Sequence, residues 1–414
     1  MVPNGWVEKP LKDICKKTIS YGIVQTGENI ENGIPCVRVV DLSKNTLNPN
    51  EMINTSEEIH QSYKKTILCE GELMMALRGE IGLVKKVTPE LIGANITRGL
   101  ARLSPIKSVD SDYLLWTLRS NKIKNELARK SGGSALQEIA LGSLRKVVLP
   151  VPPLPEQRKI AKILSTWDKA ITTTERLIAT SQQQKKALMQ QLLTGKKRLL
   201  DPETGKAFEG EWEEVKLGDV ISLGRGFAFK SSQYADSGTK VVRVTNIASS
   251  GHIDLSDCVY VPNEITNEYQ KYALKNEDIL LVMVGATAGK LGFVSENILP
   301  SLLNQNMWSL RTRNLDKLNQ LFLRHIAERI VARYMLTQQG SARGFFTQST
   351  FELVNFQVPS VEEQQKIASV LTAADKEIEL LEAKLAHLKE EKKALMQQLL
   401  TGKRRVKVDV MEMA

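Results

Sequence analysis

The chain has few cysteines, histidines and aromatic residues, and it has no long apolar run. Among its 414 residues are 4 cysteines and 4 histidines, and aromatic residues make up 5%. The cysteines have no CxxC spacing, which disfavours a disulfide framework or a zinc site. The longest apolar run, 279–284, is far too short to cross a membrane, and the N-terminus lacks an apolar signal segment. These absences predict a cytoplasmic protein.

Positive charge, by contrast, is in excess. Lys and Arg number 57 against 47 Asp and Glu, which gives a formal net charge of +10. Such an excess favours a polyanionic partner such as nucleic acid, although charge alone does not decide this. With 42% apolar residues over 414 positions, the chain can bury more than one core.

The sequence is a duplication. The twelve residues KKALMQQLLTGK occur at 185–196 and again at 392–403. At a constant offset of 207, residues 151–198 and 358–405 are identical at 26 of 48 positions. A period of half the chain is far longer than the roughly 20–50 residues of solenoid repeats. The pattern predicts two whole domains, each followed by the same long segment.

Each repeated segment has the pattern of a long helix. From Ile367 to Leu399, apolar residues follow alternating steps of three and four, which indicates a coiled-coil seam. The first copy keeps this rhythm from Ile160 to Leu192, with polar residues in the middle of its seam. We predict that the two seams pair antiparallel within one chain. Homodimerisation through the same seams is the alternative.

The ends of these segments carry helix signals. Pro155 and Glu156 suit a first turn, because proline has no amide to lose and a carboxylate favours the positive end of the helix dipole. In the second copy, Ser360 and Glu363 have the spacing of a capping box. Both segments end in Thr-Gly-Lys, which offers a glycine for a left-handed cap. The first helix is therefore expected over 156–193.

The rest of the chain reads as two diverged copies of one domain. Trp6 aligns with Trp212, and Val37-Arg38-Val39 aligns with Val242-Arg243-Val244. Short β-branched runs separated by turn residues predict mixed α/β domains with one twisted sheet each, and amphipathic helices are expected at 113–127 and 318–336. The predicted fold is α/β (α+β): two domains separated by two long antiparallel coiled-coil helices, as a pseudo-two-fold internal repeat. The expected boundaries are 1–150 and 206–357 for the domains, and 151–199 and 358–406 for the helical spacers.

This arrangement, with PPLPEQRKIAKIL at 152–164 and VPSVEEQQKIASVL at 358–371, resembles the DNA specificity subunit of type I restriction-modification systems. The resemblance covers the whole chain. It implies that 1–150 and 206–357 are target-recognition domains, each reading one half of a split double-stranded DNA sequence. It also implies that the helices space the domains and bind DNA methyltransferase (modification) subunits, of which two are expected, and that restriction (endonuclease and translocase) subunits join the complex. Pro155 is replaced by Glu362 in the second copy, where the expected capping box compensates.

Catalysis is not expected in this chain. Residues 285–290 resemble a phosphate-binding loop, but they have three residues between the two glycines where that motif has four. Leu291 occupies the position at which a Ser or Thr would bind magnesium. No motif of an amino-methyltransferase is present. The resemblance implies that S-adenosylmethionine, ATP and magnesium belong to the partner subunits, and no cofactor or metal is expected here.

Polar and basic residues at turns between the expected strands are the candidates for DNA contact. Arg38 and Arg243 match between domains that should read different bases, so phosphate positioning is expected of them. The candidates in the first domain are Tyr21, Arg38, Arg78, Lys85, Lys86, Asn95, Arg98, Ser134 and Gln137, and those in the second are Arg225, Lys230, Arg243, Thr287, Lys290, Asn304, Gln305, Arg343 and Phe345.

Two other function classes remain open from sequence. The first is a stand-alone coiled-coil DNA-binding or scaffolding protein unconnected with methylation. The second is a self-contained nuclease or methylase, which the missing motifs disfavour. The DNA target and its spacer length do not follow from the sequence.

Overall fold

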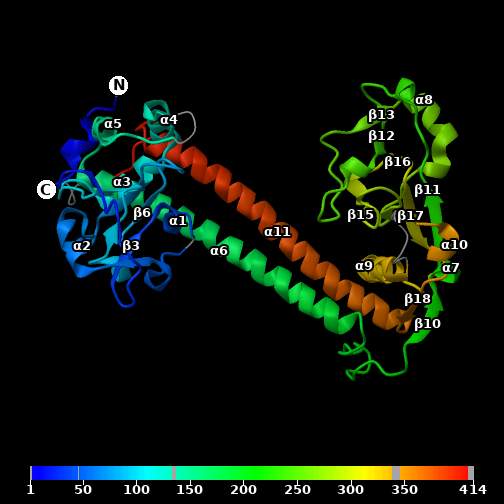
Figure 1. Ribbon diagram of the computed structural model, residues 1–414. Helices are drawn as coiled ribbons and strands as arrows, with labels where there is room; N and C mark the ends of the chain where they lie inside the picture. The colour runs from blue at the N-terminus through cyan, green and yellow to red at the C-terminus, as the bar shows by residue number, and fades with distance from the viewer. Residues whose placement is uncertain (1, 45, 133–136, 338–345, 409–414) are drawn as a thin grey trace. The chain divides into compact units, whose positions relative to one another are not determined.

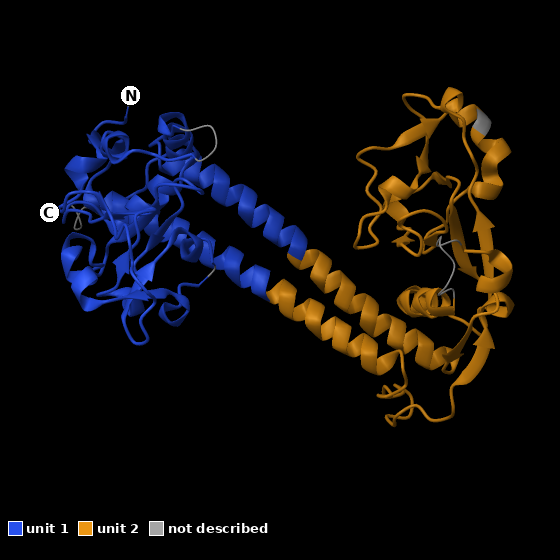
Figure 2. Ribbon diagram, in the orientation of Figure 1, with its two compact units in different colours: residues 1–176, 382–414 blue, residues 177–381 orange. Residues whose placement is uncertain are grey.

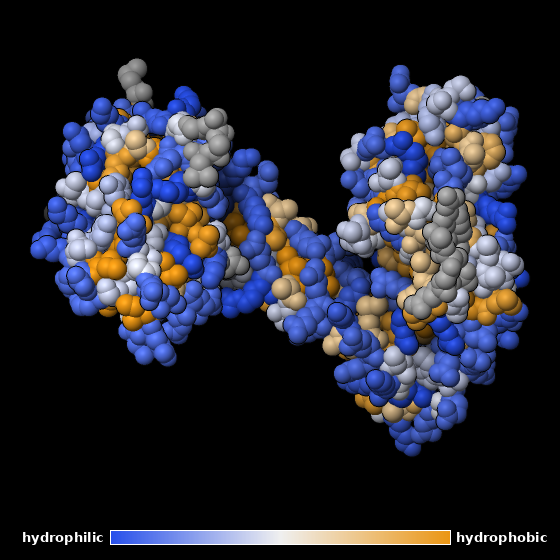
Figure 3. All heavy atoms as spheres, viewed as in Figure 1, coloured by the Kyte–Doolittle hydropathy of each residue, from blue (hydrophilic) through white to orange (hydrophobic). Residues whose placement is uncertain are grey.

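A computed structural model describes residues 2–44, 46–132, 137–337 and 346–408. The chain divides into two compact units, one of residues 1–176 with 382–414 and one of residues 177–381 (Figure 2). On the face of each unit seen in Figure 3, hydrophobic and hydrophilic residues are interspersed. Within the described ranges, none of the helices is long and apolar enough to cross a membrane.

The strands of unit 1 form three small sheets (Figure 1). An antiparallel pair joins β1 (Val7–Pro10) to β9 (Val148–Val151). A four-stranded antiparallel sheet has the order β2 (Ser20–Tyr21), β8 (Leu100–Leu103), β5 (Leu73–Ala76) and β6 (Val84–Lys86). A three-stranded sheet has the order β4 (Ile53–Thr55), β3 (Ile34–Val37) and β7 (Asn95–Ile96), in which β3 and β7 are parallel.

Unit 2 repeats this topology strand for strand. Its antiparallel pair joins β10 (Glu213–Lys216) to β18 (Asn355–Val358). Its four-stranded sheet has the order β11 (Ile221–Arg225), β17 (Met307–Thr312), β14 (Ile279–Val282) and β15 (Leu291–Phe293). Its three-stranded sheet has the order β13 (Val259–Val261), β12 (Thr239–Val242) and β16 (Ser301–Leu303), again with one parallel pairing, β12 with β16. The internal repeat is thus confirmed in the fold, although each domain has several small sheets instead of the single sheet expected.

The apolar runs before the glycine-rich turns become strands buried on both faces. Side chains alternate between the two faces of a strand. In β5, Leu73 and Met75 face the core that packs on α3 to α5, whereas Met74 and Ala76 face a second core against the three-stranded sheet. The residues of β14 alternate between two cores in the same way. This double burial explains why MMAL and ILLV are apolar without a break.

The helices of the domains differ more than the strands do. Unit 1 contains α1 (Val39–Leu42), α2 (Glu57–Ser62), α3 (Ser111–Arg119), α4 (Asn121–Lys130) and α5 (Leu141–Arg145). Unit 2 contains α7 (Leu217–Val220), α8 (Asn263–Thr266), α9 (Gln320–Thr337) and α10 (Gln348–Phe351). The single helix expected over 113–127 is broken at Ser120, whose extended backbone places its Oγ to accept the amide of Ile123 at 3.4 Å and so to cap α4.

The two repeated segments form α6 (Leu154–Leu192) and α11 (Val361–Leu399), each 39 residues long. Within each unit the two helices run side by side and antiparallel (Figure 1). In unit 1, Asp168 pairs with Lys392, and Glu175 pairs with Lys389 at 2.7 Å. In unit 2, Lys185 pairs with Asp375. The lysines that interrupt the apolar seam therefore form ion pairs across it, at positions related by the offset of 207.

Both helices end as the sequence predicts. Gly195 and Gly402 have positive φ angles of 68° and 72°, in the left-handed region that a side chain disfavours. The capping box at the start of α11 is only half formed. Ser360 Oγ accepts the amide of Glu363 at 3.4 Å, but the Glu363 carboxylate binds Arg198 instead of closing the box.

Candidate nucleic-acid interface

One turn occupies the same place in both domains, where the chain passes from the three-stranded sheet to the four-stranded sheet. We call it the crossover turn: residues 97–99 in unit 1 and 304–306 in unit 2. Three backbone hydrogen bonds hold it in unit 1, at 3.0 Å from Thr97 to Val37, 2.8 Å from Arg98 to Ile23 and 2.8 Å from Leu77 to Gly99.

The matching bonds in unit 2 run from Asn304 to Val242 at 3.0 Å, from Gln305 to Phe227 at 2.9 Å, and from Met283 to Asn306 at 2.9 Å. Arg98 and Gln305 are therefore structural counterparts, separated by the same 207 positions as the repeated segments. The glycine that directly follows the neighbouring strand, β2 or β11, comes very close to the chain in both domains. A Cβ added to Gly22 would lie 1.8 Å from the carbonyl oxygen of Ile96, and one added to Gly226 would lie 1.8 Å from that of Asn304.

In unit 1 the turn presents two arginines. Arg98 is exposed, and its side chain has no hydrogen bond or ion pair with any residue that the structure describes. Arg78 is adjacent, since a Cβ on Gly99 would lie 3.5 Å from its Cγ. Its guanidinium reaches Glu138 at 3.4 Å, beside the exposed Gln137, while its Nε has no partner within the part of the chain that the structure describes. Tyr21, on the adjacent strand β2, is 45% exposed.

In unit 2 the turn presents two amides. Asn304 is 8% exposed, and neither its Nδ2 nor the Oε1 of Gln305 has a hydrogen-bond partner among the described residues. A buried polar group without a partner costs about 1–3 kcal/mol, so both atoms gain if a ligand supplies one. Beside them lies an aromatic cluster of Phe227, Phe229, Tyr269 and Tyr272, with ring centroids 4.8–6.3 Å apart. No periodic pattern predicts this cluster, because Phe227 and Phe229 follow β11 whereas Tyr269 and Tyr272 lie in a 3-10 helix about 40 positions later in the chain.

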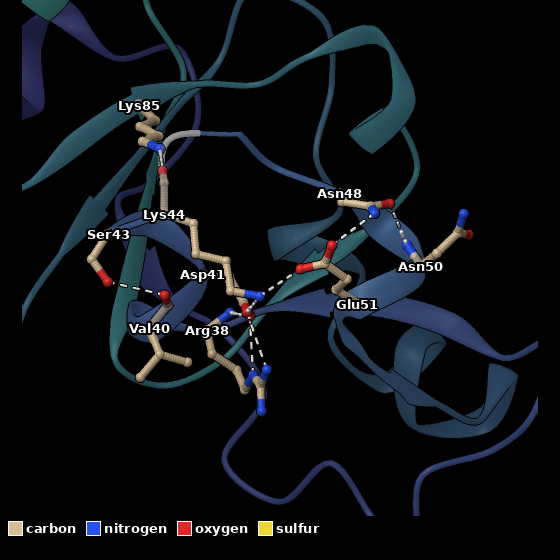
Figure 4. A network of polar contacts seen from close by, with 9 residues as sticks. All are labelled: Arg38, Val40, Asp41, Ser43, Lys44, Asn48, Asn50, Glu51 and Lys85. Carbon is tan, nitrogen blue, oxygen red and sulfur yellow. Dashed lines mark hydrogen bonds and ion pairs between the residues drawn. The ribbon is translucent and has the colours of Figure 1, made fainter. Parts of the chain in front are cut away.

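The two matched arginines each bind residues of their own domain, and Figure 4 shows the contacts of Arg38. Arg38 donates Nε and a terminal nitrogen to Asp41 at 3.0 and 3.1 Å, and this ion pair raises the pKa of Arg38 above its ordinary value. Arg243 donates to the backbone oxygen of Asp257 at 2.7 Å and to its carboxylate at 3.3 Å. Each arginine begins a short helical turn, so its charge is partly neutralised where it stabilises the fold.

Several other candidates are also engaged by protein atoms. Lys85 donates to the carbonyl of Lys44 (Figure 4), and its partial burial lowers its pKa. Lys86 pairs with Asp112 at 2.8 Å. Asn95 is fully buried and binds Thr66 at 2.7 Å, so the expectation that it meets DNA at the surface is not compatible with this structure.

Among the remaining candidates of unit 2, Arg225 is the last residue of β11, and Lys230, Thr287 and Lys290 lie between strands. Arg225 donates to Gln348 at 2.8 Å, and Lys290 donates to the carbonyl of Ile247. Lys230 and Thr287 are exposed. Ser134, Arg343 and Phe345 lie outside the described residues.

The Glu-Gln pair at the start of each long helix has a structural role that the sequence did not reveal. In unit 1, Glu156 accepts from Trp6 Nε1 at 3.0 Å and from Arg405 at 2.6 and 2.7 Å. Gln157 accepts the amide of Asp110 at 2.8 Å, which ties α6 to the start of α3. Glu156 and Gln157, at the beginning of the first repeat, thus bind both the first domain and the end of the second repeat.

We call this set of contacts the lock. The same lock occurs in unit 2, where the start of the second repeat binds the end of the first. Glu363 accepts from Arg198 twice at 2.7 Å, and Gln364 accepts the amide of Asn319 at 2.9 Å. Trp212 occupies the place of Trp6, but its Nε1 is buried and has no hydrogen-bond partner in the described ranges of the chain. These contacts explain why the identities between the repeats concentrate at their two ends.

Comparison with known proteins agrees with this architecture. Residues 3–180 and 209–390 match the family described as type I restriction modification DNA specificity domain. The MjaVIII specificity subunit of Methanocaldococcus jannaschii, a type I restriction enzyme component, is 28% identical over 313 residues, which are 73% of this chain and 72% of that protein. The EcoKI specificity subunit of Escherichia coli is 21% identical over 318 residues, 74% of this chain and 67% of that protein.

A crystal structure of the S subunit of a type I restriction-modification system from M. genitalium has the same fold. It superposes with a TM-score of 0.61 at 15% identity and covers 97% of this chain and 98% of its own. With two specificity domains that together span most of its length, this chain belongs to the type I restriction-modification DNA specificity family.

Proposed function

We propose that this chain is the noncatalytic DNA-reading subunit of a type I restriction-modification complex, and that the crossover turns of its two domains read the two halves of a split target. The observation that carries the proposal is the matched turn. The same hydrogen bonds hold it in both domains, but its side chains are Arg98 in one and Asn304 with Gln305 in the other. Because the backbone of the turn is the same in both domains and its side chains differ, the side chains can recognise different bases.

The chemistry of these side chains indicates which bases each turn prefers. In the major groove, arginine pairs in bidentate fashion with the O6 and N7 of guanine, whereas asparagine and glutamine pair with the N6 and N7 of adenine. We therefore expect Arg98 to select a guanine in the half-site of unit 1. Asn304 or Gln305 is expected to select an adenine in the half-site of unit 2.

The test is to map every methylated adenine by single-molecule sequencing in cells that express this chain with its modification subunit. Arg98→Ala should relax one position of one half-site, since a bidentate base contact is worth about 1–3 kcal/mol of discrimination. Arg129→Ala, on the exposed face of α4, is the matched control and should leave the motif unchanged. If Arg98→Ala instead lowers methylation equally at all target sites and leaves the motif unchanged, Arg98 binds phosphate.

Gln305→Ala and Asn304→Ala should change only the other half-site, and the unit 1 half-site should be kept. Change in both half-sites after a substitution in one turn would contradict the assignment of one half-site to each domain.

We further propose that α6 and α11, which both pass from one unit into the other, set the spacing between the half-sites. Removing seven residues from each helix at facing positions keeps the heptad register and shortens the pair by about 10 Å. About 10 Å corresponds to roughly three base pairs at 3.4 Å each. The preferred spacer should shorten accordingly in the methylation map, and an unaltered spacer would refute the ruler role.

Family membership favours this function over a stand-alone scaffold. In the proposed complex, modification subunits bind the helices and methylate adenine with S-adenosylmethionine, and a restriction subunit uses ATP and magnesium. The target adenine must leave the base stack to be methylated, a step proposed for the modification subunit.

A further inference from the structure

Unit 1 has a groove of about 530 Å³ between the end of α11 and the junction of α3 with α4. Its apolar floor includes Leu83, Met396 and Leu400. Among the residues that the structure describes, its lining contains lysines and an arginine but no Asp or Glu. The first turn of α4 also lines it, and the N-terminus of a helix carries partial positive charge.

Three of the cations in the groove are tied to protein atoms and form its wall. Lys392 lies 4.5 Å from the ring centroid of Trp116 and pairs with Asp168. Arg119 lies 5.2 Å from the same ring and donates to the carbonyl of Val84 at 2.9 Å. Lys389 pairs with Glu175 at 2.7 Å. The wall is therefore held in place without any ligand.

Four further lysines line the groove without partners. The ammonium groups of Lys122, Lys124, Lys393 and Lys403 have no hydrogen bond or ion pair with any of the residues described for this unit. Like charges gathered around one hollow repel one another and favour an anion. These groups are free to bind one.

The lining of the groove differs between the two copies of the repeat. Unit 2 has a pocket of about 440 Å³ in the corresponding place, where Leu193, Thr194 and Arg333 stand for Leu400, Thr401 and Lys124, but its lining includes Glu214. Trp116 donates to Ser165 at 3.0 Å, and in unit 2 His325 meets Thr372 at 3.0 Å in the same place, so Arg119 corresponds to Glu328. Lys389 corresponds to Gln182 at the offset of 207. The helix α9 also continues where α3 breaks, so unit 2 has no second helix start there. A role common to both domains would not require these differences.

We propose that this groove binds an acidic, partly apolar segment of a partner subunit, and that this contact is made by unit 1 alone. Carboxylates meet the four free lysines, and apolar side chains cover the floor. Duplex DNA is the less suitable occupant, because the phosphates on its outer surface bring charge but no apolar groups to cover the floor, whereas a peptide supplies both carboxylates and apolar side chains. The proposal rests on the proposed function, in which this chain works within a complex.

The repeat supplies a matched experiment. Lys393 and Lys403 lie in the second copy of KKALMQQLLTGK, and Lys186 and Lys196 are their exposed counterparts in the first copy. The variants K393E/K403E and K186E/K196E thus make the same change in the same twelve residues, next to different domains. The probes are a fluorescent peptide of alternating Glu and Leu and a fluorescent nonspecific duplex, each titrated into the full-length protein.

K393E/K403E should weaken peptide binding roughly tenfold or more, since attraction becomes repulsion, whereas K186E/K196E should have little effect. Equal weakening by both variants would overturn the proposal, and so would loss of duplex binding in K393E/K403E with peptide binding kept. The methylation map of each variant is recorded in parallel. If the split motif is intact but the two variants bind the peptide equally, only the groove proposal is refuted. If the wild type produces no methylated motif, the proposed function itself is refuted.

Discussion

Arg198→Ala is expected to lower the free energy of unfolding of unit 2 by about 3–5 kcal/mol, the usual cost of removing one partner from a buried ion pair. The Glu363 side chain is 0% exposed, and its two oxygens each accept from Arg198 at 2.7 Å. Without the guanidinium, a buried carboxylate at the start of α11 loses its counter-charge. The measurement is native-state hydrogen exchange in urea, which compares amides of α9 in unit 2 with those of α3 in unit 1.

Two further variants make this test specific. Lys197→Ala alters the exposed neighbour of Arg198 and should change stability by no more than about 0.5 kcal/mol. In the double variant Arg198→Ala/Glu363→Gln no carboxylate remains to be left unpaired, so it should recover part of the loss. A loss of equal size in α3 and α9, or no recovery in the double variant, would contradict the lock between the ends of the repeats.

Unit 2 is also expected to lose stability as the pH falls from about 6.5 to 4, by up to about 3 kcal/mol from one histidine. Burial of His325 lowers its pKa from 6.5 to about 4, against the opposing effect of Asp375 and with small additions from Lys185 and Arg324. Between these values the unfolded chain binds a proton that the folded unit does not, so stability is complete above pH 6.5 and declines below it. The measurement is urea unfolding of unit 2 at pH 5 and pH 7.5.

His325→Gln keeps a hydrogen-bonding group near Thr372 and cannot titrate, so it should flatten this part of the pH profile. His387→Gln is the matched control, because His387 lies on α11 in unit 1 with its side chain 73% exposed. Equal slopes for wild type and His325→Gln would show that other groups carry the pH dependence.

The long helices and the duplication were predictable because their signals are local. The seam of α11, the proline at the start of α6 and the glycines after both helices act on neighbouring residues, and the observed bounds differ from the expected ones by one or two positions for α6. The break at Ser120 was missed because the apolar periodicity continues through it. A capping serine inside such a pattern was the available signal.

The DNA-contact residues were harder to select, since their availability depends on distant partners. Lys86 pairs with Asp112, 26 positions away, and Asn95 binds Thr66, 29 positions away. Both candidates are therefore engaged by residues that are distant in the sequence. Arg98 and Arg78 were both among the candidates, but only the fold places them at one turn. The matched backbone hydrogen bonds of Arg98 and Gln305 show that the two residues present their side chains from equivalent turns.

The sequence by itself determined that the chain is built twice, that each copy ends in a long helix, and that the repeated segments resemble those of type I specificity subunits, because repetition and periodicity are properties of the linear order. Only the tertiary structure decided which charges are paired, which amides lack partners, and why Glu-Gln at the start of each repeat goes with arginine at the end of the other. Those contacts join residues 150 to 249 positions apart, and the free energy of a buried charge or amide depends on what surrounds it in space.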